Sequence, residues 1–274
     1  MTEDHLCAPI DFQSEAFAET LCALALAAGA RALEIYGGDI AADLKDDASP
    51  VTEADRAGEA IILAGLEKTA PHIPVLAEER ASEEGAPADL GEAFFLVDPL
   101  DGTREFINKT GEFTVNIALS LQGRPVAGVV YAPALGRIYY GAEGAGAWRA
   151  EVGPEGAMGA RAPIAARAVP EKGLVAVASR SHRSAETDAY LDGLDVADFA
   201  AAGSSLKFCL LAEGRADIYP RFGRTMEWDT AAGQAVLEAA GGVVLTHPEG
   251  ARLACGKAER GYDNPHFIAW GVRD

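Results

Sequence analysis

The stretch FFLVDPLDGTREF, residues 94–106, joins an apolar run directly to two aspartates, a glycine and a threonine. Its aromatic and β-branched residues predict a buried strand, and such a strand has no structural need of two carboxylates at its end. Asp98 and Asp101 flank Pro99-Leu100, so a turn there can bring both side chains to one point. Two carboxylates held close together away from water repel each other unless a cation or a proton lies between them. The stretch therefore predicts a strand that ends in a cation site.

Acids also stand where other apolar segments end. Glu78 and Glu79 follow the short run IPVLA, and Asp229 begins the helix-like stretch DTAAGQAVLEAAGG. Such acids often do no more than end a strand, and Asp229 also fits the N-cap position of a helix. Mg²⁺ prefers oxygen ligands and commonly uses one or two carboxylates together with waters and phosphate. The residues alone leave both interpretations open.

Gly102 and Thr103 follow the two aspartates and open a predicted helix. Backbone N–H groups at the start of a helix bind phosphate, and glycine lets a ligand approach closely. Cations beside a phosphate site form an arrangement for phosphoryl transfer. The residues therefore predict a metal-dependent phosphatase. A GxSxG motif is absent, and we expect water rather than a serine or cysteine side chain to be the nucleophile.

Length and composition narrow the class of protein. The chain has 274 residues, enough for one large domain or two packed sub-domains, and its net charge is −19. This acidity does not fit a nucleic-acid-binding protein. The longest apolar segment is interrupted by Gly29 and Arg31, and the acidic N-terminus lacks the basic start of a secretory signal, so no membrane span is expected. The scattered cysteines, which are Cys7, Cys22, Cys209 and Cys255, predict reduced thiols in a cytoplasmic protein and no zinc site.

Helical and strand patterns follow one another in two halves. Five further helices are predicted: one over 14–36, one that starts near residue 52, one that ends near residue 192, and two within 204–214 and 229–242. Strands are predicted at IPVLA, AFFLV, FTVNIALSL, RPVAGVVYAP, RIYYG, GLVAVAS, RADIYPRF and VVLT. The Gly-, Pro- and Ala-rich segment 153–163 is the best boundary candidate. We expect layered α and β structure, with an N-terminal α+β sub-domain over 1–155 and a C-terminal α/β sub-domain over 156–274.

DPLDGT at 98–103 and WDTAAG at 228–233 resemble the two signatures of the inositol monophosphatase superfamily, and VLAEE at 75–79 stands upstream in the expected place. The segments SPVTEAD, GEFTVNIAL, GVVYAP, SRSH, GSSLKFCLLAEG and YPRFG resemble the CysQ-type 3'(2'),5'-bisphosphate nucleotidases within it. The resemblance implies an α+β fold, the layered αβαβα sandwich of the inositol monophosphatase and fructose-1,6-bisphosphatase type.

The resemblance also implies roles for residues at matching positions. The metal ligands would be Glu78, Asp98, Asp101, Asp229 and the Leu100 carbonyl, for two or three Mg²⁺ ions. Thr103 would orient the attacking water, its amide and that of Gly102 would hold the phosphate, and Glu79 would support water activation. Asp55 would hold a further metal or its water, but Thr52-x-x-Asp55 equally fits a helix capping box. Ala77 departs from the pattern, because serine or glycine usually precedes the two glutamates; we expect little effect on the metals.

A substrate with several negative charges needs cations in so acidic a site. GSSLKF supplies Ser204, Ser205 and Lys207 for a second phosphate, although a capped helix with a surface lysine explains the same residues. Arg221 and Arg180 are further candidates.

The substrate implied by the resemblance is adenosine 3',5'-bisphosphate, a by-product of sulfate assimilation, hydrolysed to AMP and phosphate with inhibition by Li⁺. Inositol monophosphates, fructose-1,6-bisphosphate and a non-catalytic metal-binding regulator remain alternatives. The sequence leaves open whether the protein is a monomer or a homodimer, and whether it associates peripherally with the inner face of the cell membrane.

Overall fold

The computed structural model describes residues 11–45, 50–87, 89–178 and 184–273. In chain order the elements are α1 (Glu15–Tyr36), β1 (Ala42–Leu44), β2 (Pro50–Thr52), α2 (Glu53–Thr69), β3 (Val75–Ala77), α3 (Glu78–Glu84), β4 (Ala93–Asp101), α4 (Thr103–Ile107), β5 (Thr114–Leu121), β6 (Arg124–Ala132), η1 (Pro133–Leu135), β7 (Arg137–Ala142), β8 (Gly146–Glu151), β9 (Ala162–Ile164), β10 (Leu174–Ala178), α5 (Ala185–Asp192), β11 (Val196–Ala201), α6 (Leu206–Ala212), β12 (Ile218–Arg221), α7 (Glu227–Ala239), β13 (Val243–Thr246), η2 (Ala258–Arg260) and β14 (Phe267–Trp270).

The first two long helices begin where their capping residues predict. The Ser14 hydroxyl accepts a hydrogen bond from the Phe17 amide at the start of α1, and Gly37 ends the helix. Thr52 caps α2 in the predicted capping box, because the Asp55 carboxylate accepts from both the amide and the hydroxyl of Thr52. Such caps satisfy amides that have no partner within the helix.

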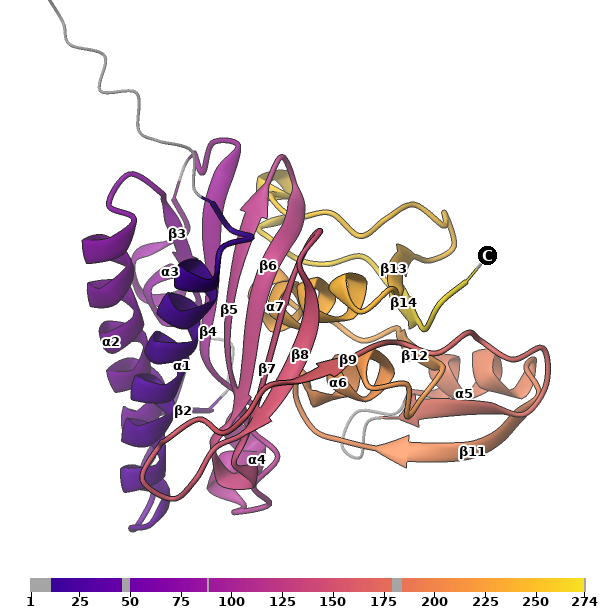
Figure 1. The fold of residues 1–274 in the computed structure, drawn as a ribbon, viewed down its shortest axis with the longest axis horizontal. Helices are drawn as coiled ribbons and strands as arrows, with labels where there is room; N and C mark the ends of the chain where they lie inside the picture. Colours follow the sequence, from indigo (N-terminus) through magenta and orange to yellow (C-terminus); the bar gives the residue numbers. More distant parts are fainter. Residues whose placement is uncertain (1–10, 46–49, 88, 179–183, 274) are drawn as a thin grey trace, which may run out of the picture.

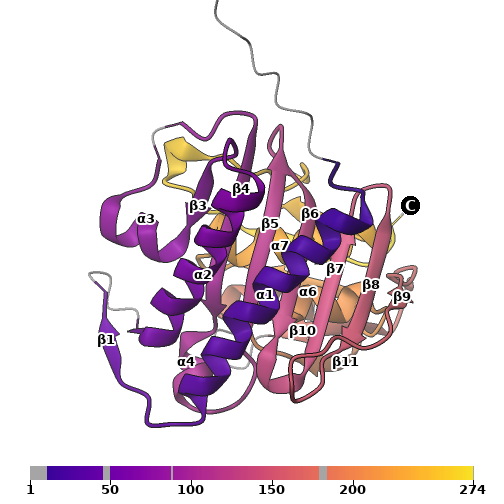
Figure 2. The same cartoon turned by 60° about the vertical axis from the view of Figure 1, so that its left-hand side comes forward.

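β3–β9 form a seven-stranded sheet in which consecutive strands are neighbours; β3 and β4 are parallel and the other pairs are antiparallel. α1 and α2 cover one face, where Leu21 and Ala25 pack against Val115 and Ile117 of β5 (Figures 1 and 2). α7 lies on the opposite face, against the side of the sheet that carries Ala118. The central strands are apolar on both faces because helices bury both.

β10–β14 form a five-stranded sheet in the order β11-β10-β12-β14-β13. α6 and α7 fill the space between the two sheets, where Phe208 packs against Tyr219 and Phe267. α5 covers the outer face, where Leu191 lies in a cluster with Ile218. The layers are therefore α1/α2, sheet, α6/α7, sheet and α5 (Figure 1), which confirms the expected layered α+β fold.

Two glycines bring α7 close to the large sheet. A Cβ atom on Gly128 of β6 would lie 2.7 Å from the Ala232 carbonyl oxygen, and one on Gly141 of β7 would lie 2.7 Å from the Val236 Cα. Any side chain at either position would push the helix away. This contact sets the position of α7, and with it the position of Asp229 in its first turn.

Several elements differ from the prediction. The sequence patterns missed the short or edge strands β1, β2, β8, β9, β11 and β14, and α7 begins at Glu227, two residues before the predicted start. β9 still pairs with β8, so the chain passes from one sheet to the other after Ile164. The division into units of residues 1–155 and 156–274 remains a proposal.

α1 is long and apolar enough, by length and composition, to cross a membrane. A core helix meets the same criterion, and Leu21, Ala25 and Ala28 of α1 are buried in the cluster beneath the large sheet. The expectation that the chain has no membrane span remains a prediction.

Candidate active site

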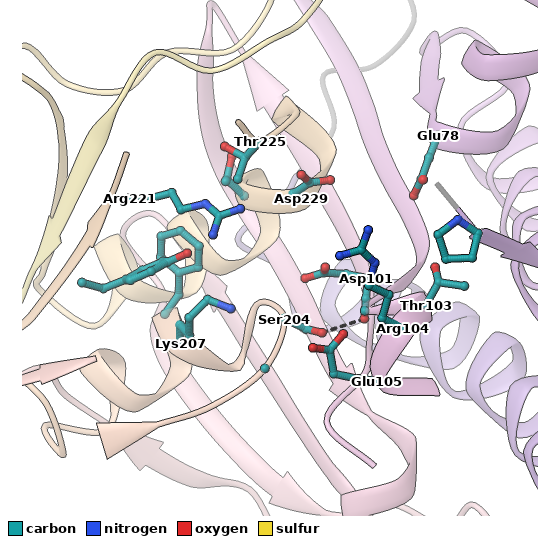
Figure 3. A pocket seen from close by; sticks show the side chains of 16 residues that line it. Glu78, Asp101, Thr103, Arg104, Glu105, Ser204, Lys207, Arg221, Thr225 and Asp229 are labelled. Carbon is teal, nitrogen blue, oxygen red and sulfur yellow. Dashed lines mark hydrogen bonds between the residues drawn. The ribbon is translucent and has the colours of Figure 1, made fainter. Parts of the chain in front are cut away.

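A pocket of about 310 Å³ opens where the ends of β4 and β12 meet α3, α4, α6 and α7. Figure 3 shows Lys207 and Arg221 on one side of it and Asp101 and Thr103 on the other. The lining residues that carry charge are Glu78, Asp101, Arg104, Glu105, Lys207, Arg221 and Asp229. Acidic and basic side chains therefore face the same space.

The end of β4 is irregular, as the turn between the two aspartates predicts. Asp98 pairs with Asn116 and Asp101 with Thr114 on β5, and the register shifts between the two pairs. The Asp98 carboxylate accepts a hydrogen bond of 3.0 Å from the Leu100 amide, which closes the turn over Pro99. Asp98 is only 1% exposed, so its charge lies away from water.

Glu78 and Glu79 begin α3, and both carboxylates contact one cation. The Lys45 ammonium group lies 2.7 Å from an oxygen of each. Lys45 follows β1 and was not singled out by sequence analysis, because no local pattern links it to residues more than thirty positions later. Although burial opposes this, the two carboxylates raise the pKa of Lys45 above its usual value.

Asp229 lies in the first turn of α7. Its carboxylate accepts a hydrogen bond of 2.9 Å from the Met226 amide, so Met226 is the N-cap and the alternative that Asp229 itself is the N-cap is wrong. The carboxylate still satisfies the start of the helix from its third position, which is also where a negative charge is favourable.

Asp98, Asp101 and Asp229 have raised pKa values because they are buried and because nearby negative charges repel theirs. Burial, followed by the charge of Glu78, raises the pKa of Asp98 well above its usual value. Burial, followed by the charge of Asp101, does the same for Asp229. Burial also raises the pKa of Asp101 to about 6. Ionisation of these carboxylates is therefore unfavourable in free energy, and a cation bound between them would offset the repulsion of their charges.

The donor set fits a hard divalent cation, since it consists of buried carboxylate oxygens. The side chains do not yet enclose such an ion: among the described residues, no group of three or more His, Cys, Asp or Glu side chains lies close enough together to hold a metal. Lys45 engages Glu78, one of the four acids. Glu78, Asp101 and Asp229 line the pocket, and Asp98 is buried near enough for their charges to raise its pKa; the role of these four acids as metal ligands remains a prediction.

Thr103 and Asp55 are in contact, although 48 positions separate them. The Thr103 hydroxyl lies 3.1 Å from an Asp55 oxygen and 3.4 Å from the Leu100 carbonyl oxygen. The other Asp55 oxygen is used by the capping box. The capping box and the link to Thr103 are therefore both present, one on each carboxylate oxygen, and Asp55 fixes the direction of the Thr103 hydroxyl group.

Ser204 and Ser205 connect the start of α6 to the acidic segments. The Ser204 hydroxyl donates to the carbonyl oxygens of Asp101 and Glu112 at 2.7 and 2.8 Å, and the Ser205 hydroxyl donates to the Asp229 carbonyl oxygen at 2.8 Å. We expected these hydroxyls to bind a second phosphate, but their protons already serve protein carbonyls. Any contact of these serines with phosphate remains a proposal.

Gly102 must be glycine for two reasons. Its φ of +94° lies in the left-handed region, and a Cβ there would stand 2.3 Å from the Ser204 hydroxyl oxygen. The α4 helix that follows has only five residues, so the amides of Gly102 and Thr103, rather than a long helix dipole, are what a phosphate would meet.

Lys207 and Arg221 supply the predicted positive charge. Lys207 is 8% exposed and lies over the Tyr219 ring, 5.6 Å from its centre. Burial lowers the pKa of Lys207 to about 8, although the Asp101 charge opposes the shift. Arg221 also lines the pocket, and its Nη2 group donates a hydrogen bond of 3.1 Å to the Arg224 carbonyl oxygen. Arg180, the remaining predicted cation, lies outside the described residues.

Arg104 is a cation that sequence analysis missed. It is exposed, follows Thr103 directly and lines the pocket beside Asp101 (Figure 3). Sequence analysis could have identified Arg104 from its position directly after Gly102 and Thr103, whose amides are predicted to bind phosphate.

Cys209 and Arg215 have the Cys-x5-Arg spacing of thiol-dependent phosphatases. However, Cys209 is buried in α6 and burial raises its pKa well above the usual value. A nucleophilic cysteine needs a lowered pKa and access to substrate. This pair therefore does not fit a catalytic thiol.

Curated relatives are similar to this protein over most of the chain. The chain is 48% identical to the 3'(2'),5'-bisphosphate nucleotidase CysQ of Salmonella typhimurium over 232 residues, which are 81% of this chain and 87% of the relative. It is 46% identical to the 3'(2'),5'-bisphosphate nucleotidase CysQ of Escherichia coli strain K12, again over 232 residues that make up 81% of this chain and 87% of the relative. The CysQ-type likeness of the sequence is thus confirmed.

Solved structures agree in fold. CysQ from Bacteroides thetaiotaomicron, a bacterial member of the inositol monophosphatase family, superposes with a TM-score of 0.77 at 39% identity, covering 94% of this chain and 98% of its own. The inositol monophosphatase from Anabaena gives a TM-score of 0.71 at 26% identity, covering 94% and 91%. The sequence profile of the inositol monophosphatase family matches residues 13–267. Sequence and fold thus agree, and the chain belongs to the inositol monophosphatase family.

Proposed function

We propose that the protein is a Mg²⁺-dependent phosphatase that removes the 3'-phosphate of adenosine 3',5'-bisphosphate. Water adds to the 3'-phosphorus, the bond from phosphorus to the 3'-oxygen of the ribose breaks, and the products are AMP and inorganic phosphate. The names of the CysQ relatives support this substrate class. The family as a whole generally uses metal ions; the choice of Mg²⁺, and of two or three ions, belongs to the proposal.

One observation carries the substrate proposal. The pocket combines an acidic half, suited to cations that hold the reacting phosphate, with a basic half formed by Lys207 and Arg221. A substrate with one phosphate has no second group for these cations. A bisphosphate matches both halves, because its second phosphate would neutralise the buried Lys207 ammonium and the Arg221 guanidinium that line the basic half.

Mg²⁺ bound by Glu78, Asp98, Asp101, Asp229 and the Leu100 carbonyl would neutralise charge on the phosphate and make water a better nucleophile at neutral pH. The remaining work falls to the side chains. Because the Thr103 hydroxyl donates a hydrogen bond to Asp55, its oxygen lone pairs are left to accept a hydrogen bond from the attacking water and so orient it.

We infer that Glu79, which neighbours Glu78 in the first turn of α3, is the proton acceptor. Burial, followed by the charge of Glu78, raises the pKa of Glu79 to about 7, although the hydrogen bond from Lys45 opposes the shift. A carboxylate with such a pKa can take a proton from water at neutral pH and release it again. Lys45 keeps this carboxylate in place at 2.7 Å. Lys207 and Arg221 orient the substrate through its second phosphate.

Phosphate release measured with and without Mg²⁺ tests the proposal on three substrates: adenosine 3',5'-bisphosphate, inositol-1-phosphate and fructose-1,6-bisphosphate. We expect Mg²⁺-dependent release, fastest from the nucleotide and inhibited by Li⁺. Faster release from either sugar phosphate would move the assignment to another member of the family. No release from any of them would leave only a metal-binding regulator.

We also propose that the protein works in the cytoplasm. The cysteines Cys22, Cys209 and Cys255 are free and buried, as expected of reduced thiols.

A further inference from the structure

α3, which carries the first two acids of the site, has no cap of its own. The residue before it is Ala77, whose methyl group cannot accept a hydrogen bond from the free amides at the start of the helix. The amides of Glu79 and Arg80 instead donate to the two carboxylate oxygens of Glu59, at 2.7 and 2.8 Å. Glu59 lies in α2, twenty positions earlier, and is 5% exposed.

We propose that Glu59 is a positioning residue that fixes the start of α3 and thereby aims Glu78 at the metal ions. This inference rests on the proposed function, because it takes Glu78 to be a metal ligand. Glu59 itself touches neither substrate nor metal; it acts through the backbone of α3.

The α2 helix holds two parts of the site at once. Asp55 and Glu59 are four positions apart, so they lie on the same face of α2, and both are buried. Asp55 holds the Thr103 hydroxyl and Glu59 holds the first turn of α3. One seventeen-residue helix, packed against β4, thus sets the distance between the water-orienting threonine and the acids of α3.

α3 needs this external support. It has only seven residues, and a helix so short is not stable by itself. A charged acceptor on two amides makes short, directional hydrogen bonds, so it fixes both the position and the rotation of the first turn. Glu78 is the first residue of that turn, and a small rotation would carry its carboxylate away from Asp98 and Asp101.

The test is the affinity of the full chain for Mg²⁺, measured by isothermal titration calorimetry after metal removal. Glu59→Gln keeps the size but leaves one amide facing an NH₂ group, and Glu59→Leu removes both acceptors. We expect the dissociation constant of Mg²⁺ to rise about tenfold in the first and up to about a hundredfold in the second, the range for residues that orient metal ligands. Glu59→Asp keeps the charge but withdraws the carboxylate by one methylene, and we expect weaker binding there too.

Asp217→Asn is the matched control. Asp217 is also fully buried, accepts a backbone hydrogen bond of 2.7 Å from Val175 and pairs with Arg167, but it supports the five-stranded sheet. This variant should lower the melting temperature as the Glu59 variants do, yet bind Mg²⁺ within about twofold of the wild type.

Mg²⁺ affinity equal to the wild type in Glu59→Gln overturns the proposal, and this milder variant decides the matter if Glu59→Leu does not fold. Wild-type affinity in Glu59→Asp beside weak binding in Glu59→Gln also overturns it, because long-range charge would then explain the effect. A wild-type protein that binds Mg²⁺ but releases phosphate from no substrate refutes the proposed function instead and leaves the role of Glu59 in metal binding intact.

Discussion

Lys207 should make the use of a bisphosphate depend on pH in a way that a monophosphate does not share. Its ammonium group is buried at the pocket, and burial lowers its pKa to about 8. A lysine with a lowered pKa is charged below that pKa and neutral above it. Only the charged form attracts the second phosphate, so the effect is present at pH 7 and is lost as the pH rises through 8.

The size of the effect follows from the pKa. With a value of about 8, roughly nine-tenths of the molecules carry the charge at pH 7 and roughly one-tenth at pH 9. Because kcat/KM reports the free enzyme, it should fall about tenfold between these two pH values, which corresponds to about 1.4 kcal/mol. Mg²⁺ at Asp101 would weaken the charge that opposes the shift, so with metal bound the fall begins at a lower pH.

The assay is phosphate release at saturating Mg²⁺ from pH 6 to 9.5, for adenosine 3',5'-bisphosphate and a monophosphate substrate. Dividing kcat/KM of the wild type by kcat/KM of Lys207→Arg at each pH removes the titration of every other group, because arginine stays charged throughout. We expect this ratio to fall with rising pH for the bisphosphate, beginning below pH 8 because Mg²⁺ is bound, and to stay flat for the monophosphate. Lys207→Ala should raise KM for the bisphosphate far more than for the monophosphate at pH 7. A falling limb that persists in Lys207→Arg, or an equal KM effect on both substrates, would refute the reasoning.

Three further predictions concern the acids. Asp98→Asn should lower kcat at least a hundredfold with an unchanged circular dichroism spectrum, since it removes the most buried charge of the proposed metal site; wild-type turnover at saturating Mg²⁺ would contradict the ligand assignment. In metal-free protein the raised pKa values of Asp101 and Glu79, about 6 and about 7, mean that the folded state binds more protons than the unfolded state, so stability falls as the pH rises from about 4 to 7. Calorimetry should therefore give a melting temperature several degrees higher at pH 5 than at pH 7.5, because one pKa unit corresponds to about 1.4 kcal/mol and one kcal/mol to about 2–4 °C. Mg²⁺ should reduce this difference in melting temperature. A higher melting temperature at pH 7.5 than at pH 5 in the metal-free protein would exclude this account. Lys45→Met should tighten Mg²⁺ binding several-fold by titration calorimetry, because the lysine competes for Glu78; unchanged or weaker binding would show that Lys45 is not displaced.

Much of the fold could be predicted because its signals are local. Ser14 before α1 and Gly37 after it are capping residues, and Thr52 and Asp55 form the capping box of α2. Two edge strands, β9 and β11, were missed: β9 has only three residues, and β11 has six but exposes much of its surface, so neither shows a clear apolar pattern.

The candidate site was predicted in its acids but not in its supports. Asp98 and Asp101 are recognisable because acids at the end of a buried strand are unusual. Lys45 and Glu59 looked like ordinary charged residues of a loop and a helix. What distinguishes them is the partner each meets, at Glu78 and at the amides of α3, and that partner lies far along the chain.

The sequence by itself determined the long helices, most of the central strands, the two signatures and the acids of the site, because these depend on neighbouring residues and on residue types. Only the tertiary structure decided how the pocket is held. α7 approaches the large sheet over Gly128 and Gly141, which carries Asp229 to the end of β4, and the Ser204 and Ser205 hydroxyls are spent on protein carbonyls. Such contacts form between segments that are distant in the chain, so their geometry follows from the packing of whole layers and not from any local pattern.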